Sequence, residues 1–335
     1  MNKLYFLFFT SITFCASIIA QPILNYSNMA PQAGTSYTNH NINPSSVTVG
    51  SDGANITWDF SGVVETSTTT SQYMAPASTP YETSFPGSNM STYNASGGIY
   101  SYLNYNNSYY DMVGAYSPSG VVLYYSNNER IMTFPFTYNS VSNDDFVCDF
   151  VSGGYDFHRS GSVVMTCVGY GTLILPFGTY TNILKLKMEE TYTDEYDVGT
   201  GPQIINYTSA NYYWYTPGVP EPLFAITALT SSMAGTSEYA FYLDQNDITL
   251  YLNNFISDNN ISIYPNPVID KLTIEYNNEA NKSIKYQIID LRGSIVLEDV
   301  LYMNNEIDIS NFSAGIYMLK LQTENEIKTY KIVKE

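Results

Sequence analysis

Clustered basic residues are missing from most of this sequence. The 335 residues include 13 lysines and arginines against 31 aspartates and glutamates. Between residues 21 and 257, the basic side chains are Arg130, Arg159, Lys185 and Lys187. Binding to phosphate backbones needs clustered lysine and arginine. Nucleic acid is therefore excluded as a partner of this region, and its acidic balance favours solubility outside the cell.

Long apolar runs are also lacking after the first twenty residues, so no membrane-spanning segment is predicted. Residues 1–20 hold one charge, Lys3, followed by a short apolar run that ends in Ala20. A basic start, a short apolar stretch and a final small residue are the pattern of a secretory signal peptide. We expect cleavage after Ala20, so that the mature chain begins at Gln21.

Cysteine is scarce, with three residues in the whole chain. One of them, Cys15, falls in the signal peptide. The stretch from Cys148 to Cys167 is typical of two strands around a glycine-rich turn, and exported proteins meet oxidising conditions. A register that places Cys148 opposite Cys167 also pairs Phe150 with Met165. We therefore predict a Cys148–Cys167 disulfide, with two buried free thiols as the alternative.

Helical periodicity is absent as well. Short runs rich in Tyr, Val, Ile, Thr and Phe alternate with Gly, Pro, Asn and Ser, which predicts many short strands. The 33 tyrosines suit half-buried sheets. Residues 21–255 are predicted to form one large all-β domain, an antiparallel β-sandwich that ends with a hairpin turning near Asn246-Asp247.

A second, smaller domain is predicted at the C-terminus. Residues 256–260 form a polar break that we interpret as a linker. About seven short strands follow within residues 261–335, separated by turns such as Arg292-Gly293 and Ala314-Gly315. This number and spacing of strands predicts a small Ig-like, seven-stranded β-sandwich. The whole mature chain is therefore expected to be all-β.

Five short motifs in this smaller domain are in the order and spacing of a known family. Residues 258–335 resemble the type A C-terminal sorting domain of the type IX secretion system of Gram-negative bacteria. Phrases in the larger domain, such as "NITWDFSG", look like those of uncharacterised exported proteins with the same sorting domain. The matching residues are Tyr264, Pro265, Asn266 and Pro267, then Asp270, Asp290, Gly293, Gly315 and Tyr317, and finally Lys331 and Lys334.

The resemblance implies a route and partners. The chain would cross the inner membrane with its signal peptide, fold in the periplasm, and be carried through the outer membrane by the type IX translocon. A sortase-like protease would then remove the sorting domain, and the product would be released or joined to surface lipopolysaccharide. The expected location is therefore the cell surface or the medium.

Catalytic motifs are not found. Two histidines, His40 and His158, support neither a Ser-His-Asp triad nor a zinc site. Carboxylates could serve a secreted, glycosidase-like hydrolase or hold calcium at Asp194, Glu195 and Asp197 in a predicted loop. A solvated acidic surface remains the simplest interpretation. The two acidic clusters are Asp144, Asp145, Asp149 and Asp156, and Glu189, Glu190, Asp194, Glu195 and Asp197.

Aromatic residues next to amides suggest a different function. Exposed tyrosine and tryptophan can stack on sugar rings, whereas alternate rings of a strand can equally be core residues. We expect a non-enzymatic adhesive or glycan-binding domain that needs no cofactor, and the hydrolase is the alternative. The candidate stacking residues are Tyr212, Tyr213, Trp214 and Tyr215.

Overall fold

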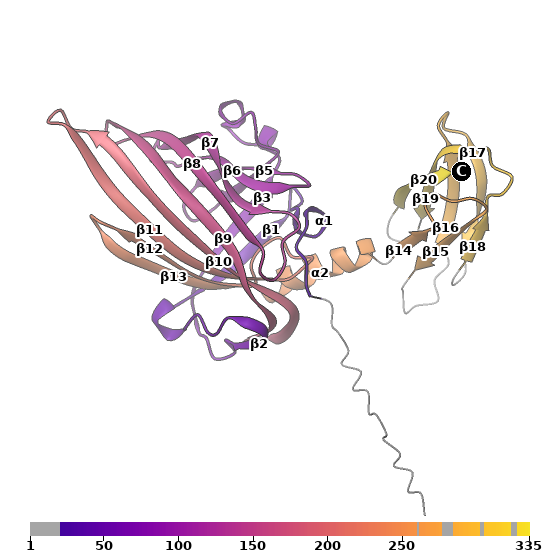
Figure 1. Ribbon diagram of the computed structural model, residues 1–335, viewed down its shortest axis with the longest axis horizontal. Coiled ribbons are helices and arrows are strands. Elements are labelled where there is room, and N and C mark those ends of the chain that lie inside the picture. Colours follow the sequence, from indigo (N-terminus) through magenta and orange to yellow (C-terminus); the bar gives the residue numbers. More distant parts are fainter. Residues whose placement is uncertain (1–20, 260, 277–283, 302–304, 323–326) are drawn as a thin grey trace, which may run out of the picture. The chain divides into compact units, whose positions relative to one another are not determined.

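The chain folds into two units, Met1–Ile248 and Thr249–Glu335, and each is described here by itself. Strands predominate in both, so the all-β prediction is confirmed (Figure 1). The predicted signal peptide lies outside the described residues. The computed structural model describes residues 21–259, 261–276, 284–301, 305–322 and 327–335.

The first unit consists of strands and a few short helices. Its earlier strands are β1 (Ser36–Ile42), β2 (Gly53–Asp59), β3 (Glu65–Met74), β4 (Met90–Asn94), β5 (Ile99–Tyr105), β6 (Tyr109–Tyr116) and β7 (Val122–Thr133). Its later strands are β8 (Val141–Ser152), β9 (Tyr155–Leu175), β10 (Gly178–Asp197), β11 (Pro202–Tyr215), β12 (Phe224–Ser231) and β13 (Gly235–Leu243). The short helices are α1 (Tyr26–Met29) and the 3-10 turns Pro44–Ser46, Pro76–Ser78 and Glu82–Ser84.

All of these strands belong to one sheet that closes on itself. The order is β10-β11-β12-β13-β1-β3-β4-β5-β6-β7-β8-β9-β2, and β9 pairs with β10 as well. This extra antiparallel pairing joins the two ends, so that every strand except β2 belongs to a barrel-like ring. The structure thus corrects the expected sandwich of two packed sheets to a single closed sheet.

The main hydrophobic core lies inside the ring. One cluster of buried side chains draws on strands distributed around the ring, with Leu103 from β5, Met132 from β7, Phe146 from β8, Met165 from β9 and Leu186 from β10. Strands on different sides of a ring can share a core only through its interior. Since side chains alternate along a strand, this cluster identifies the inner face of each strand.

The β8–β9 hairpin exists as predicted, but in another register. Its strands turn at Gly153-Gly154, where both residues have positive φ (58° and 83°), a conformation that glycine adopts without strain. This tight turn places Cys148 opposite Arg159, eight positions along β9 from Cys167. Both cysteines are buried and free. The predicted disulfide is therefore wrong, and the alternative of two buried thiols holds.

The segment around β2 covers part of the outer face of the ring. β2 pairs parallel with β9 beyond the end of β8. A Cβ atom at Gly171 would lie 1.9 Å from the carbonyl oxygen of Ile56, so only glycine allows this approach. The fully buried Lys185 anchors the same segment, because its Nζ contacts Asp52 at 2.6 Å and the Gly50 carbonyl at 3.1 Å.

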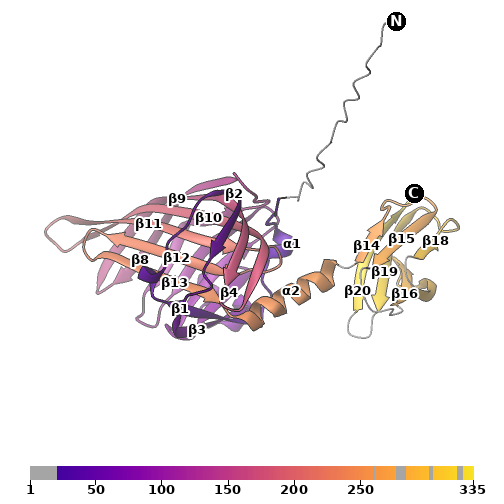
Figure 2. The ribbon, with the colours of Figure 1, turned by 90° about the horizontal axis from the view of Figure 1, so that it is seen from below.

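A helix stands where the sequence predicts a closing hairpin and a linker. α2 spans Gln245–Asn259, as Figure 2 shows, and it includes most of the predicted linker. The carboxylate of Asp244 accepts a hydrogen bond from the Asn246 amide at 2.8 Å, as a helix N-cap does. Asp247 accepts one from the Thr38 amide at 2.7 Å, which ties the first turn of α2 to β1.

The second unit has two small sheets around one core. The sheet orders are β14-β15-β18 and β17-β16-β19-β20. Both sheets contribute to one buried cluster, with Leu272 and Ile307 from the first and Ile288, Leu319 and Ile332 from the second. The strands are β14 (Ile261–Tyr264), β15 (Lys271–Tyr276), β16 (Ile284–Asp290), β17 (Ile295–Leu301), β18 (Asn305–Asp308), β19 (Gly315–Gln322) and β20 (Ile327–Lys334).

The free cysteines give a direct check on the β8–β9 register. Burial raises the pKa of both thiols, Cys148 and Cys167, to about 12. We expect neither to react with iodoacetamide at pH 8 in the folded protein, because the thiolate is the nucleophile. Both should be alkylated after denaturation without a reductant. Recovery of a Cys148–Cys167 linked peptide from non-reduced protein, measured by mass spectrometry, would contradict this register.

Candidate functional site

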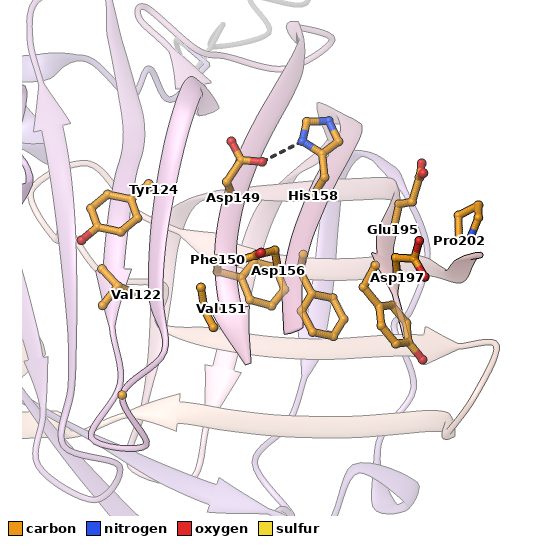
Figure 3. Close-up of a pocket in the computed structure, with 13 residues that line it drawn as sticks. Val122, Tyr124, Asp149, Phe150, Val151, Asp156, His158, Glu195, Asp197 and Pro202 are labelled. Carbon is orange, nitrogen blue, oxygen red and sulfur yellow. Dashed lines mark hydrogen bonds and ion pairs between the residues drawn. The ribbon is translucent and has the colours of Figure 1, made fainter. Parts of the chain in front are cut away.

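A cavity of about 850 Å³ lies at one end of the closed sheet (Figure 3). Its walls come from the β8–β9 hairpin, from the end of β10, from the start of β11 at Pro202, and from the start of β7 at Val122. The volume is within the range of about 300–1,000 Å³ that is typical of small-molecule sites. This is therefore the candidate binding site of the first unit.

Three aromatic rings form a row along the cavity. The ring centroids of Phe150 and Phe157 are 4.9 Å apart, and those of Phe157 and Tyr196 are 4.6 Å apart. The three residues are cross-strand neighbours on β8, β9 and β10. They alternate with exposed residues and share the face of buried Cys148, so the row continues the inner face of the ring to its end.

An ion pair lies one step further into the ring. The Arg159 guanidinium donates two hydrogen bonds to the buried carboxylate of Asp194, at 2.7 and 2.8 Å. It also lies over the rings of Tyr192 at 4.4 Å and Phe150 at 5.2 Å. Burial lowers the pKa of Arg159, but the bonds to Asp194 outweigh this and raise it. The buried Arg159–Asp194 ion pair thus lies directly beside the aromatic row, and its two charges balance each other.

Carboxylates and one histidine alternate with the aromatic rings along the same strands. Asp149, His158 and Glu195 are cross-strand neighbours on β8, β9 and β10, and all three are exposed. The Asp149 carboxylate is 2.7 Å from Nδ1 of His158, as Figure 3 shows. Asp156 and Asp197 line the cavity nearer the turns. Because side chains alternate along a strand, these carboxylates and His158 point to the face opposite the aromatic row. The cavity lining therefore includes apolar rings and acceptors for hydroxyl groups, on opposite faces of the same strand ends.

A pair of acids that the sequence did not indicate lies inside the ring. Burial raises the pKa of Glu129, and a hydrogen bond with Glu190 raises it further. The Tyr125 hydroxyl lies 3.1 Å from Glu129, and the Ser209 hydroxyl lies 2.5 Å from Glu190. Such a pair holds one proton between two carboxyl groups. Only Glu190 belonged to a predicted acidic cluster.

The predicted calcium ligands do not meet. Asp194, Glu195 and Asp197 belong to β10 rather than to a loop. Asp194 is buried against Arg159, while its neighbour Glu195 points to the opposite face. Within the described residues, no group of three or more His, Cys, Asp or Glu side chains is arranged to hold a metal ion. The calcium prediction is therefore wrong for this set.

The other acids of the predicted clusters have separate roles. Asp144 accepts a hydrogen bond from the Arg130 amide at 3.0 Å. Glu189 pairs with Lys187 at 2.7 Å on the solvent side. Asp145, next to Asp144 on β8, is exposed. These residues form no common site, whereas Asp149, Asp156, Glu195 and Asp197 all reach the cavity.

The predicted stacking residues lie far into the fold. Trp214 is fully buried, with its ring 5.3 Å from Phe60 and 5.4 Å from Phe224. No ring face is left for a sugar, so the prediction is wrong for Trp214. Tyr213 and Tyr215 pack against the interior cluster, and Tyr212 lies beside Lys185 at 5.2 Å. The alternative of core-facing rings applies to this stretch.

His40 joins three elements around the start of α2. Its Nδ1 lies 2.5 Å from Glu65 of β3, and its Nε2 lies 2.9 Å from Asp244. The ring also stacks on Tyr242 of β13 at 4.8 Å. Since a carboxylate only accepts, both ring nitrogens must carry protons here. Burial lowers the pKa of His40, but the bonds to Asp244 and Glu65 outweigh it and raise the pKa.

In the second unit, the first and last motifs predicted for sorting are in contact. Asn266 donates a hydrogen bond from its side chain to the Lys331 carbonyl at 2.8 Å and accepts one from the Val333 amide at 2.8 Å. Val268 continues this pairing, through its amide to the Val333 carbonyl at 2.8 Å. The "YPNP" motif thus holds the terminal strand β20 in place.

Three further motif residues, Asp290, Gly293 and Tyr317, shape turns next to these strands. The Asp290 carboxylate accepts hydrogen bonds from the amides of Arg292 at 2.9 Å and Ser294 at 3.0 Å. Gly293 completes this turn with a φ of +83°. The Tyr317 hydroxyl donates to the Ser313 carbonyl at 2.9 Å. Asp290, Tyr317 and Ile332 are cross-strand neighbours.

This arrangement has a counterpart among known families. Residues 262–335 match the family model of the secretion system C-terminal sorting domain. The resemblance noted from the motifs is thereby confirmed, and we call residues 262–335 the sorting domain. A comparison with curated proteins found no significant match.

The sorting domain defines where the protein goes. It interacts with the type IX secretion machinery, and the protein is exported to the cell surface or beyond. None of the helices in the described part of the chain is both long and apolar enough to cross a bilayer.

The His40 cluster predicts a pH dependence with a defined sign. A raised pKa means that the folded state binds the proton more tightly than the unfolded state does. The contribution of protonated His40 to stability is fully present below the unfolded pKa of about 6.5 and is lost as the pH rises through the folded pKa. Between pH 6 and 9, the free energy of unfolding of the wild type should therefore fall by about 1 kcal/mol more than that of His40→Gln. Chemical denaturation measures this, and parallel pH profiles would contradict it.

The contact between Asn266 and β20 gives a second prediction. Asn266→Ala removes two hydrogen bonds to the β20 backbone and should cost the sorting domain about 1–3 kcal/mol. Surface delivery should fall with it, as measured by protease accessibility on intact cells. Asn311→Ala, at an exposed asparagine in the same unit, is the matched control. Wild-type stability and delivery of Asn266→Ala would refute the assigned contact.

Proposed function

We propose that the closed sheet is a carbohydrate-binding domain that the sorting domain carries to the cell surface or the medium, where it acts as an adhesive protein. The observation that carries this proposal is the row of Phe150, Phe157 and Tyr196 in the cavity at the end of the ring. The rings are attached to paired strands and are therefore held in a fixed row.

The chemistry of the cavity suits a sugar. Aromatic faces stack on the apolar C–H faces of sugar rings, and carboxylates accept hydrogen bonds from sugar hydroxyls. The row of Phe150, Phe157 and Tyr196 supplies the first kind of contact. Asp149, Asp156, Glu195 and Asp197 line the cavity on the opposite face of the same strands, and they supply the second kind where the ligand extends around the strand ends. In this proposal the row of rings, and not Trp214, stacks on the sugar.

The same cavity disfavours acidic ligands. His158 is the basic side chain among its lining residues, and Asp149 already pairs with it. A sulfated or uronic-acid glycan would meet several carboxylates without a free cation. Neutral glycans therefore fit the lining better than acidic ones.

A glycosidase-like hydrolase is the alternative function. Retaining glycosidases hold two carboxyl groups about 5–5.5 Å apart, and inverting ones about 6.5–9.5 Å. Glu129 and Glu190 share a hydrogen bond, which leaves no room for a sugar or a water between them. The alternative would rest on Asp149 and Glu195, which are both exposed on the strands that flank β9. Neither is held in the apolar surroundings that a catalytic acid of this class needs, so binding is the better-supported function.

The remaining partners follow from the export route. Residues 1–20 act as the signal peptide for the inner membrane. A sortase-like protease removes the sorting domain after export, and the closed sheet is then released or attached to lipopolysaccharide. Attachment would hold a carbohydrate-binding domain at the surface, as adhesion to extracellular glycans requires.

Removal of the central ring tests the proposal. Phe157→Ala takes away the middle of the aromatic row and should lower glycan affinity at least tenfold, since a buried ring contributes roughly 1.5–3 kcal/mol. The measurement is a glycan array with neutral, amino and acidic oligosaccharides, followed by titration calorimetry on the best ligand.

Tyr239→Ala is the matched control for this measurement. Tyr239 is an aromatic residue of β13 that is 66% exposed, and it lies outside the cavity lining. Its removal should leave the affinity unchanged. An array without any signal for the wild type, or equal affinities of wild type and Phe157→Ala, would refute the glycan-binding proposal.

A further inference from the structure

The four-stranded sheet of the sorting domain has two unlike faces. One face packs into the domain core through Ile288, Leu319, Leu321 and Ile332, which are all buried. Side chains alternate along each strand, so the neighbours of these residues point away from the core. The outward face of a sheet with one buried side is normally polar.

Half of this outward face is apolar. Ile289 pairs with Ile295 on one side and with Met318 on the other, and Ile316 pairs with Val333. These five residues form a continuous strip across β17, β16, β19 and β20, which we call the apolar strip. Ile295 is 51% exposed and Ile316 is 39% exposed. An exposed apolar patch of this kind marks an interaction surface.

The turn beside the strip is apolar too. Leu291, in the turn that joins β16 to β17, is 73% exposed. The same turn is held by Asp290 and Gly293, two residues of the sorting motifs. The motif residues therefore fix the shape of this end of the sheet but leave its apolar side chains uncovered.

Positive charge borders the strip. Lys331 is the cross-strand neighbour of Met318, and Lys320 is two residues further along β19 on the same face. A partner that covers this surface must bury apolar side chains and place acidic groups opposite the lysines. Lys331 and Lys320 thus place positive charge next to the apolar strip.

We propose that the apolar strip, with Leu291 and the two lysines, is the surface by which the sorting domain docks on the type IX translocon. The proposal follows from two observations together. The family match says that this unit is the part of the chain that the secretion machinery handles. The outward sheet face is the apolar, motif-bordered surface that the unit presents for such a contact. This docking proposal does not depend on the proposed binding of glycans.

Export of the full-length protein in its native host tests the proposal. The variant Ile295→Thr/Ile316→Thr keeps two β-branched residues but makes the strip polar. Surface delivery, measured by protease accessibility against the periplasmic amount, should fall at least tenfold, because a buried isoleucine contributes strongly to an apolar contact. Ile316→Val should restore most of the delivery lost in Ile316→Thr.

Ile269→Thr is the matched control. Ile269 is 62% exposed in the same unit and lies outside the four-stranded sheet. This variant should be delivered like the wild type. Normal delivery of the folded double variant would overturn the proposal, and so would an equal loss in Ile269→Thr, which would show a general sensitivity to lost apolar surface.

Two further variants decide the question if the double variant does not fold. Leu291→Thr and Lys331→Glu both change exposed side chains, and unfolding curves of the purified chains show whether each is folded. Each should lower delivery several-fold, and Lys331→Glu should accumulate in the periplasm as folded protein. Wild-type delivery of both would overturn the proposal and place the docking surface on another part of the sorting domain.

Discussion

The pairing of β9 with β10 is the contact on which the rest of the first unit depends. These are the two longest strands, of 21 and 20 residues, and their pairing joins the ends of the sheet. Without it, the inner faces of the strands would not enclose a common core. Closure also places Arg159 against Asp194 and continues the row of aromatic rings to the end of the ring. The cavity is a consequence of this closure.

The sequence predicts strand content well and strand connection poorly. Alternating apolar residues and turn residues indicate β structure throughout the chain, and this is what both units contain. Nothing in a local pattern distinguishes a closed ring from two packed sheets, because both have one buried face. The helix α2 was missed for a local reason. Asp244 and Asn246 are typical turn residues, yet here Asp244 caps a helix.

The candidate sites were predictable to different degrees. The sorting motifs are short contiguous stretches, so they could be recognised in the sequence. The contact of Asn266 with β20, in contrast, forms only when the chain folds. The cavity brings together strand ends from distant parts of the chain, and no spacing in the sequence shows that. Phe150 and Phe157 become neighbours only because Gly153-Gly154 forms a tight turn. A register longer by eight residues, as the disulfide required, would have separated them.

Closure of the sheet is tested most directly by hydrogen exchange along β10 in the purified protein. In the closed sheet, residues 184–196 of β10 pair on both sides, with β9 and with β11. Successive backbone amides of this stretch should therefore be protected to a similar degree, up to the stability of the whole unit. In an open sandwich with β10 at an edge, every second amide of the stretch would face solvent. Exchange of alternate amides between Leu184 and Tyr196 within minutes, beside protected neighbours, would contradict the closed sheet and the cavity that depends on it.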